Sequence, residues 1–168
     1  MRTDAKVRFA TVDDAEAISK VLRDAFTVYR DHYTDEAFAA VTPNKDVVVG
    51  RFAEGPIWLA EIDGEAVGTV SLTTEPEGLY VRSMAVSPNA QGRGVGHRLL
   101  DSVNEFAEAS EFDRIFLYTT YFVPGAKDIY EKHGFKWVRD TTADEWFGTP
   151  GLEMDRQIER KKQNVVGS

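Results

Sequence analysis

The sequence predicts an α/β domain built on a mixed, mostly antiparallel twisted sheet of about six to seven strands flanked by helices. Two observations predict this fold class. The dipeptide Asp63-Gly64 joins two strand-like runs, which is typical of a tight antiparallel hairpin because both turn residues need a positive φ. The strand-like run at 79–86 is followed by a glycine-rich turn, a helical pattern and another strand-like run at 114–120. A right-handed crossover would make those two strands parallel.

The length and the cysteine content favour a single domain without disulfide bonds. At 168 residues the chain can bury a continuous core, and we expect one domain over residues 1–158. Residues 159–168 carry charges without an apolar period, so we expect a flexible tail. The chain has no cysteine, which excludes disulfides, thiolate zinc sites and a cysteine nucleophile. We predict no bound metal.

The charge and hydropathy of the chain exclude two further classes of partner. The net charge of −8 argues against unspecific nucleic-acid binding, which needs a basic surface. It favours a cationic or neutral small-molecule acceptor, only because a negative surface attracts a diffusing cation and repels an anion. No run approaches the ~20 apolar residues that cross a bilayer, so we expect no membrane partner. The N-terminus leads into no apolar signal core, and the expected location is the cytoplasm.

The chain begins with a predicted strand at 6–10 and a helix, which Thr11 or Asp13 can cap. The helix has apolar residues at helical spacing, namely Ala15, Ile18, Val21, Leu22, Ala25 and Phe26. Between residues 27 and 56 only one further helix is predicted, at 35–41. The hairpin strands follow at 57–62 and 66–74, and a turn at 75–78 leads into the strand at 79–86, which ends before Pro88.

Three glycines at positions 92, 94 and 96 separate that strand from the next helix. The helix is indicated by apolar residues at helical spacing: Leu99, Leu100, Val103, Phe106 and Ala107. Glycine permits a positive φ and lets a ligand approach the backbone. The free N–H groups of a first helical turn, with the positive end of the helix dipole behind them, favour a phosphate or diphosphate. Arg93 and Arg98 add positive charge. The turn therefore predicts a phosphate site, although such turns also occur for packing alone.

The spacing of this turn differs from that of two common nucleotide sites. It lacks the Gly-Lys-Ser/Thr ending of a nucleoside-triphosphate loop and the glycine spacing of the dinucleotide fingerprint. The turn reads Gln91-Gly92-Arg93-Gly94-Val95-Gly96 and follows a strand that ends Met-Ala-Val-Ser-Pro. This resembles the coenzyme A signature of the GNAT family of N-acetyltransferases.

The elements after the glycine turn extend the resemblance. A strand at 114–120 is followed by a short helix with Ala126, Ile129 and Tyr130 on one face and Gly134 at its end. This helix resembles the family's Ala-x-x-Leu/Ile-Tyr-x-Lys-x-Gly-Phe element. A strand at 135–139, a polar loop at 140–150 and a strand at 152–158 complete the domain. The resemblance covers about residues 7–158.

The resemblance implies a co-substrate, acetyl-CoA, and the residues that bind it. In the family the two parallel central strands splay apart, and the pantetheine arm pairs with the backbone of the first strand. The diphosphate lies on the glycine turn. Carried over to this chain, the coenzyme-binding residues are Met84, Ala85, Val86, Gln91, Gly92, Arg93, Gly94, Val95, Gly96 and His97.

The resemblance also implies that Tyr130 is the catalytic acid. Its phenol, with an ordinary pKa of about 10, suits protonation of the departing thiolate; the alternative is that Tyr130 only packs. The family's usual glutamate base is replaced here by Tyr80, and the family's asparagine seven residues before the tyrosine by Val123. The base stays open among Glu77, Tyr80, Glu61 and His32, and the alternative is that a fast-exchanging amine needs no dedicated base. Thr119 or Lys127 could replace the asparagine's contact to coenzyme A.

The acceptor is the least determined part of the prediction. In the family the segment after the first helix shapes the acceptor pocket, which suggests Tyr29, His32, Tyr33 and Phe38 as lining, or as aromatic packing only. We expect transfer of an acetyl group from acetyl-CoA to a primary amine of a small molecule by direct attack, because no cysteine or activated serine suggests an acyl-enzyme. The alternatives are acetylation of a protein or peptide amine, and a catalytically silent acyl-CoA-binding module. Homodimers are frequent in the family.

Overall fold

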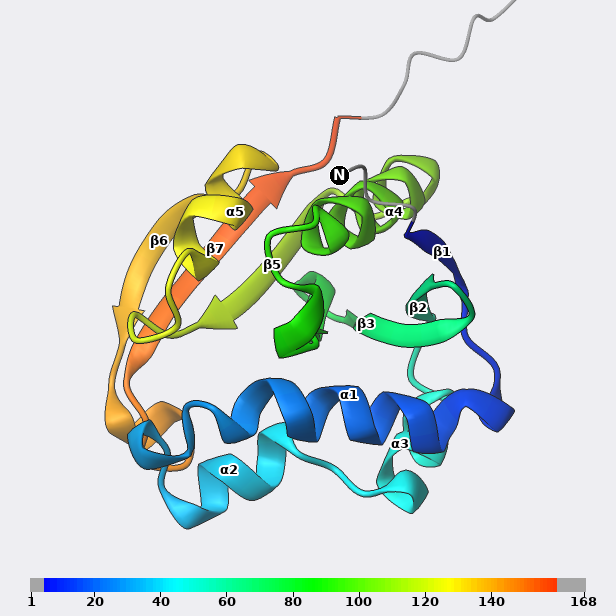
Figure 1. The fold of residues 1–168 in the computed structure, drawn as a ribbon. Helices are drawn as coiled ribbons and strands as arrows, with labels where there is room; N and C mark the ends of the chain where they lie inside the picture. Colours follow the sequence, from blue (N-terminus) through cyan, green and yellow to red (C-terminus); the bar gives the residue numbers. More distant parts are fainter. Residues whose placement is uncertain (1–4, 160–168) are drawn as a thin grey trace, which may run out of the picture.

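A computed structural model describes residues 5–159, and in this part of the chain seven strands form one sheet (Figure 1). The strands lie in the order β1-β2-β3-β4-β5-β7-β6. Their bounds are β1 (Lys6–Phe9), β2 (Ile57–Ile62), β3 (Glu65–Glu75), β4 (Gly78–Val86), β5 (Arg114–Thr119), β6 (Lys136–Thr141) and β7 (Gly151–Gln157). Only the β4–β5 pair is parallel. The predicted mixed, mostly antiparallel sheet is confirmed.

Helices cover both faces of the sheet, so that the domain has three layers. The helices are α1 (Ala15–Thr27), α2 (Asp35–Val41), α3 (Lys45–Arg51), α4 (Val95–Ala109) and α5 (Ala126–Lys132). Figure 1 shows α1, α2 and α3 on one side of the sheet and α4 and α5 on the other. Two apolar clusters fill the spaces between the layers. One lies between α4 and the sheet, and the other lies between α1 and the sheet.

A short 3-10 turn precedes helix α1, so that the predicted cap Thr11 caps this turn and Asp14, not Thr11 or Asp13, is the N-cap of α1 itself. Thr11 and Asp14 form a capping box around a short 3-10 turn, and Arg8 of β1 pairs with Asp14 at 2.8 Å and with Glu61 of β2 at 2.6 Å. The predicted apolar face of α1 is buried except for Phe26, which is half-buried.

Helix α3 was not predicted from the sequence. Its capping residue is Asn44, whose side-chain oxygen accepts a hydrogen bond from the Val47 N–H at 2.9 Å. The helix contains three consecutive valines, which favour strand, and only Val48 of them is buried. The segment therefore lacks the periodic apolar face by which helices are recognised in a sequence.

Strands β4 and β5 pair over only three residues and then separate, as the resemblance implied. The pairs are Leu79 with Ile115, Tyr80 with Phe116 and Val81 with Leu117. Strand β4 then bulges: Arg82 faces Ser71 and Ala85 faces Thr69, and Ser83 between them has a φ of 56°. From the bulge to Val86, the side of β4 that faces β5 has no strand partner.

Residues 1–4 and 160–168 lie outside the described residues, so the predicted domain boundary and nearly all of the predicted tail stay predictions. Among residues 5–159 no helix is long and apolar enough to cross a membrane.

Candidate active site

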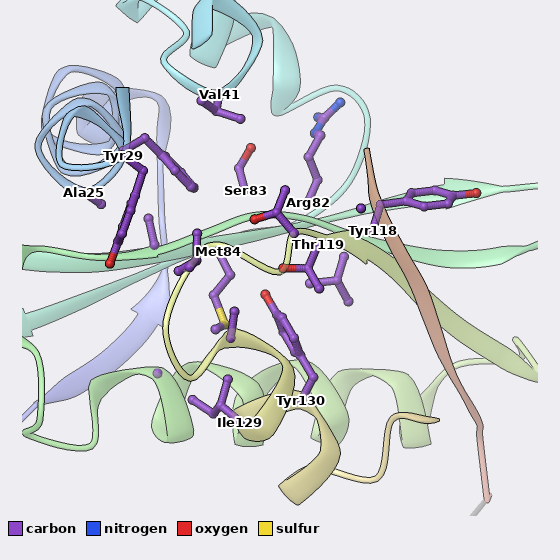
Figure 2. Close-up of a pocket in the computed structure, with 18 of the residues that line it drawn as sticks. Ala25, Tyr29, Val41, Arg82, Ser83, Met84, Tyr118, Thr119, Ile129 and Tyr130 are labelled. Atoms are coloured by element: carbon purple, nitrogen blue, oxygen red, sulfur yellow. The ribbon is translucent and has the colours of Figure 1, made fainter. Parts of the chain in front are cut away.

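A cavity of about 850 Å³ lies at the point where β4 and β5 separate (Figure 2). Its walls come from the end of α1, from α2 and α3, from β4, from the glycine turn, from the end of β5 and from α5. Because the glycine turn and the segment after α1 contribute to the same cavity, one continuous space connects the two predicted subsites.

The glycine turn leaves an open helix N-terminus at one end of this cavity. Gly92 and Gly94 both have a φ of 77°, which favours glycine, and a Cβ at Gly92 would meet nothing within 4 Å. Gly94 is the N-cap of the 15-residue helix α4 and supplies no side-chain cap. The carbonyl of Gly94 accepts from the Arg98 N–H at 3.2 Å, so the N–H groups of the preceding turn point out of the helix end. These groups fit a diphosphate.

Nine of the ten predicted coenzyme-binding residues line the cavity. The exception is Arg93, whose half-buried side chain is not part of the wall. Gly96 has a packing role as well, because a Cβ there would lie 2.9 Å from Cδ1 of Ile129. A larger residue at this position would therefore have to displace the end of the Ile129 side chain.

The backbone of β4 offers free hydrogen-bonding groups to the cavity. The Ser87 N–H donates to the Val67 carbonyl of β3 at 2.8 Å. Since successive residues of a strand point their main-chain groups in opposite directions, those of Val86 point away from β3 and into the gap. Among residues 5–159 the one hydrogen bond to these groups is long, 3.5 Å from the Gln91 side-chain amide to the Val86 carbonyl. A free strand edge of this kind fits the amides of a pantetheine arm.

Tyr130 reaches the same gap from α5. Its side chain is 8% exposed and its ring packs edge-on against Phe135 at 5.9 Å. Figure 2 shows its hydroxyl beside Thr119, directed towards β4. Burial raises the pKa of Tyr130 well above its ordinary value, so the phenol stays protonated at neutral pH and has a proton to donate.

Of the four residues predicted for the acceptor pocket, two line the cavity and two do not. Tyr29 and Tyr33 line the cavity, and burial raises the pKa of Tyr33 to about 12. His32 stacks on Phe122 at 4.7 Å and Phe38 packs against Tyr33 at 6.5 Å, and neither lines the cavity.

Of the residues considered as the base, only Tyr80 lines the cavity. Its pKa is raised by burial. Glu61 is paired with Arg8, and neither Glu61 nor Glu77 is part of the wall. The carboxylate that does line it is Glu145, which pairs with Arg139 at 2.7 Å and accepts from the Thr142 N–H at 2.7 Å. These partners lower the pKa of Glu145 to about 2, which makes it a weak base.

Of the two residues considered for the missing asparagine's contact, Thr119 lines the cavity and Lys127 does not. Several lining residues were not foreseen, among them Arg51, Arg82, Ser83 and Trp146. Arg51 ends the unpredicted helix α3, so no sequence pattern pointed to it. Within residues 5–159 no group of three or more His, Asp or Glu side chains could hold a metal ion.

The comparisons with known proteins agree with this geometry. The family model of the acetyltransferase (GNAT) family matches residues 15–135. YjgM, an uncharacterized N-acetyltransferase of Escherichia coli, is 27% identical over 138 residues, which span 79% of this chain and 82% of YjgM. N-acetylaspartate synthetase of Xenopus tropicalis is 36% identical over 83 residues, which span 48% of this chain and 31% of that protein.

A solved structure with a similar fold holds the coenzyme. PaiA N-acetyltransferase from Thermoplasma acidophilum, in complex with coenzyme A, has a TM-score of 0.74 at 18% identity, over 92% of this chain and 99% of that one. The family match covers most of the chain, and the fold and the glycine turn agree with it. This chain is therefore an N-acetyltransferase of the GNAT family.

Proposed function

We propose that the protein transfers the acetyl group of acetyl-CoA to a primary amine of a small molecule by direct attack. The observation that carries the proposal is the continuous cavity, which joins an open helix N-terminus, a free strand edge and the Tyr130 hydroxyl. Acetyl-CoA is typical of the family, and the residues present fit it.

Each part of the coenzyme has a matching surface in the cavity. The diphosphate would bind to the N–H groups of residues 92–97 at the start of α4. The pantetheine arm would run along Met84, Ala85 and Val86, where β4 lacks a partner on the side of β5. The thioester would then lie in the gap below Tyr130.

The chemical step needs no covalent enzyme intermediate. The lone pair of the neutral amine attacks the thioester carbonyl carbon, the C–N bond forms, and the C–S bond breaks with its electron pair on sulfur. The Tyr130 phenol gives its proton to that sulfur, and the proton lost by the amine nitrogen returns to the phenolate through water. The Val86 N–H can stabilise the charge on the carbonyl oxygen. Holding both reactants in one cavity supplies much of the rate, up to about 7–11 kcal/mol in ideal cases.

A small acceptor is supported by the wall opposite the coenzyme turn. Phe26, Tyr29, Tyr33 and Trp146 enclose that part of the cavity. The name of one relative, N-acetylaspartate synthetase, states an N-acetylated amino acid as its product.

The test combines binding with turnover. Calorimetry at low salt should detect acetyl-CoA binding, and release of free thiol from acetyl-CoA should rise with one class of small amine over the rate without amine. Faster turnover of peptides than of any small amine would favour a protein acceptor. Binding without turnover on any amine would favour a silent acyl-CoA-binding module.

A further inference from the structure

Three arginines line the cavity, and only one of them lacks an acidic partner. Arg82 donates to Glu54, and Arg139 pairs with Glu145 at 2.7 Å. Arg51 donates from Nη1 to the Ser83 hydroxyl at 3.0 Å, and no carboxylate of residues 5–159 lies within ion-pair distance of it. Arg51 therefore brings to the wall a positive charge that no carboxylate of the described residues contacts directly, and Glu54, which acts on it at longer range, is already paired with Arg82.

The surroundings of Arg51 make this charge receptive to an anion. The guanidinium is half-buried. Burial and the nearby Arg82 lower the pKa of Arg51 to about 10 against the opposing effect of Glu54, so Arg51 is still charged at neutral pH. Nε of Arg82 is buried and has no hydrogen-bond partner among the described residues. A partly buried charge without a partner is unfavourable, and binding an anion relieves it.

The position of Arg51 assigns the anion to the acceptor and not to the coenzyme. Ser83, its hydrogen-bond partner, directly precedes the β4 residues proposed to hold the pantetheine arm. At a rise of ~3.3 Å per residue, the three steps from Ser83 to Val86 span at most about 10 Å, and the bulge at Ser83 shortens this distance. In Figure 2 Ser83 extends from β4 towards Val41, on the side opposite Tyr130. The coenzyme diphosphate would bind at the other end of the cavity, at α4.

We infer that the acceptor is an amino acid or a close analogue, whose carboxylate binds the Arg51 guanidinium beside Ser83 while its amine faces the thioester. This inference rests on the proposed function and names its substrate class. A carboxylate matches the planar fork of a guanidinium, which can donate two parallel hydrogen bonds to it. The aromatic wall of Phe26, Tyr29 and Trp146 would then contact the rest of the molecule.

The local charge points in the opposite direction from the net charge of the chain. The sequence favoured a cationic or neutral acceptor because the net charge is −8. Surface charges farther than a Debye length, ~10 Å at 0.1 M salt, are largely screened, whereas Arg51 acts on the acceptor at close range. The charge of the cavity wall therefore decides the class of acceptor.

The experiment compares amines with and without a carboxylate. Thiol release from acetyl-CoA is measured with L-phenylalanine, L-phenylalaninamide and phenethylamine, and with aspartate, 4-aminobutyrate and the phosphonate analogue of phenylalanine. We expect kcat/KM to be about 10- to 100-fold higher for amines with a carboxylate than for their carboxylate-free partners. The phosphonate arm tests whether the site takes any anion; a phosphonate that outperforms every carboxylate would overturn the assignment.

Variants test the role of Arg51 itself. Arg51→Met should remove the preference between phenylalanine and phenethylamine and leave the affinity for acetyl-CoA unchanged, and Arg51→Lys should restore part of the preference. Arg23→Met, on the exposed side of α1 and outside the cavity wall, is the matched control. Thermal unfolding checks that each variant is folded.

The outcomes separate this inference from the proposed function. Equal or faster turnover of the carboxylate-free amines overturns the inference and leaves the proposed function standing. An equal loss for both partners in Arg51→Met also overturns it. Binding of acetyl-CoA without turnover of any amine overturns both.

Discussion

At the residue scale, a substitution of Tyr130 tests its proposed role as the acid that protonates the leaving thiolate. We expect Tyr130→Phe to lower kcat by about 10²- to 10⁴-fold, the usual contribution of a positioned acid, with little change in acetyl-CoA affinity. Calorimetry and steady-state thiol release measure the two quantities separately. Tyr121→Phe is the matched control, because Tyr121 is 57% exposed and lies outside the cavity wall. An unchanged kcat in Tyr130→Phe would show that the ring only packs.

His133 should make stability depend on pH. Its Nε2 lies 2.9 Å from Nδ1 of His97, and its Nδ1 lies 3.6 Å from Asp101. Burial and the neighbouring His97 lower the pKa of His133 below its ordinary value of 6.5, against the opposing effect of Asp101. The unfolded chain therefore takes up this proton more readily than the native one, and native stability falls as the pH drops below about 6.5. At pH values below the native pKa of His133, the stability that its neutral form contributes is fully lost.

The variant His133→Gln should reduce that loss. Urea unfolding at pH 7.5 and at pH 5.5 gives the difference in unfolding free energy for the wild type and the variant. A variant with the full wild-type difference would show that other groups carry the pH dependence.

Sequence patterns placed more of the predicted coenzyme-binding residues than of the predicted acceptor residues in the cavity wall. Nine of the ten predicted coenzyme-binding residues line the cavity because they belong to one local strand-turn-helix unit, whose geometry depends on neighbours in the chain. The acceptor wall is assembled from segments far apart in the sequence. Arg51 follows a run of valines that gives no helical period, and Tyr33 and His32 lie in an irregular segment where no periodicity tells which side chain faces inward.

At the scale of elements, two glycines differ in how much space surrounds them. A Cβ at Gly68 of β3 would lie 2.8 Å from Cγ1 of Val95 and 3.3 Å from the Ala85 carbonyl oxygen, so α4 and β4 leave no room for it. Gly50 is exposed in α3, and a Cβ there would meet nothing within 4 Å. The first position needs a glycine for its space and the second does not.

We therefore expect Gly68→Ala and Gly50→Ala to change stability in opposite directions. Gly68→Ala should lower the unfolding free energy by about 1–3 kcal/mol through overpacking. Gly50→Ala should raise it by about 0.5–1 kcal/mol through its better helix propensity and the reduced freedom of the unfolded chain. Urea unfolding measures both. Two variants shifted in the same direction would contradict this account of the packing.

At the scale of the whole molecule, acetyl-CoA should bridge two parts of the sheet. Strands β1 to β4 and strands β5, β7 and β6 are joined by three residue pairs between β4 and β5. A ligand in the gap binds the native state only, and at 100 times its dissociation constant it adds about 2.7 kcal/mol. For a chain of this size we expect Tm to rise by about 5–10 °C.

Thermal unfolding with and without acetyl-CoA measures this shift. Pantetheine, which lacks the diphosphate, is the control and should shift Tm much less at the same concentration, because it leaves the start of α4 empty. Equal shifts for the two ligands would remove the glycine turn from the binding site.

The order of the strands was only partly predictable from the sequence. The β2–β3 hairpin and the β4–α4–β5 crossover were predicted, because their strands are close in the sequence. A turn signal joins the first pair and a single helix joins the second. The placement of β7 between β5 and β6 depends on pairs such as Leu117 with Met154, which are distant in the sequence. No local pattern encodes such a pairing.

The short pairing of β4 with β5 leaves a strand edge inside the protein, where a stray polypeptide could add itself as an extra strand. The bulge at Ser83, with its left-handed backbone, bends β4 just beyond the last pair with β5. A peptide would lose its register within a few residues of such a bend. Pantetheine carries only two amide groups and needs no longer register. The bulge that accompanies the separation of β4 from β5 would thus disfavour the addition of another strand at this edge.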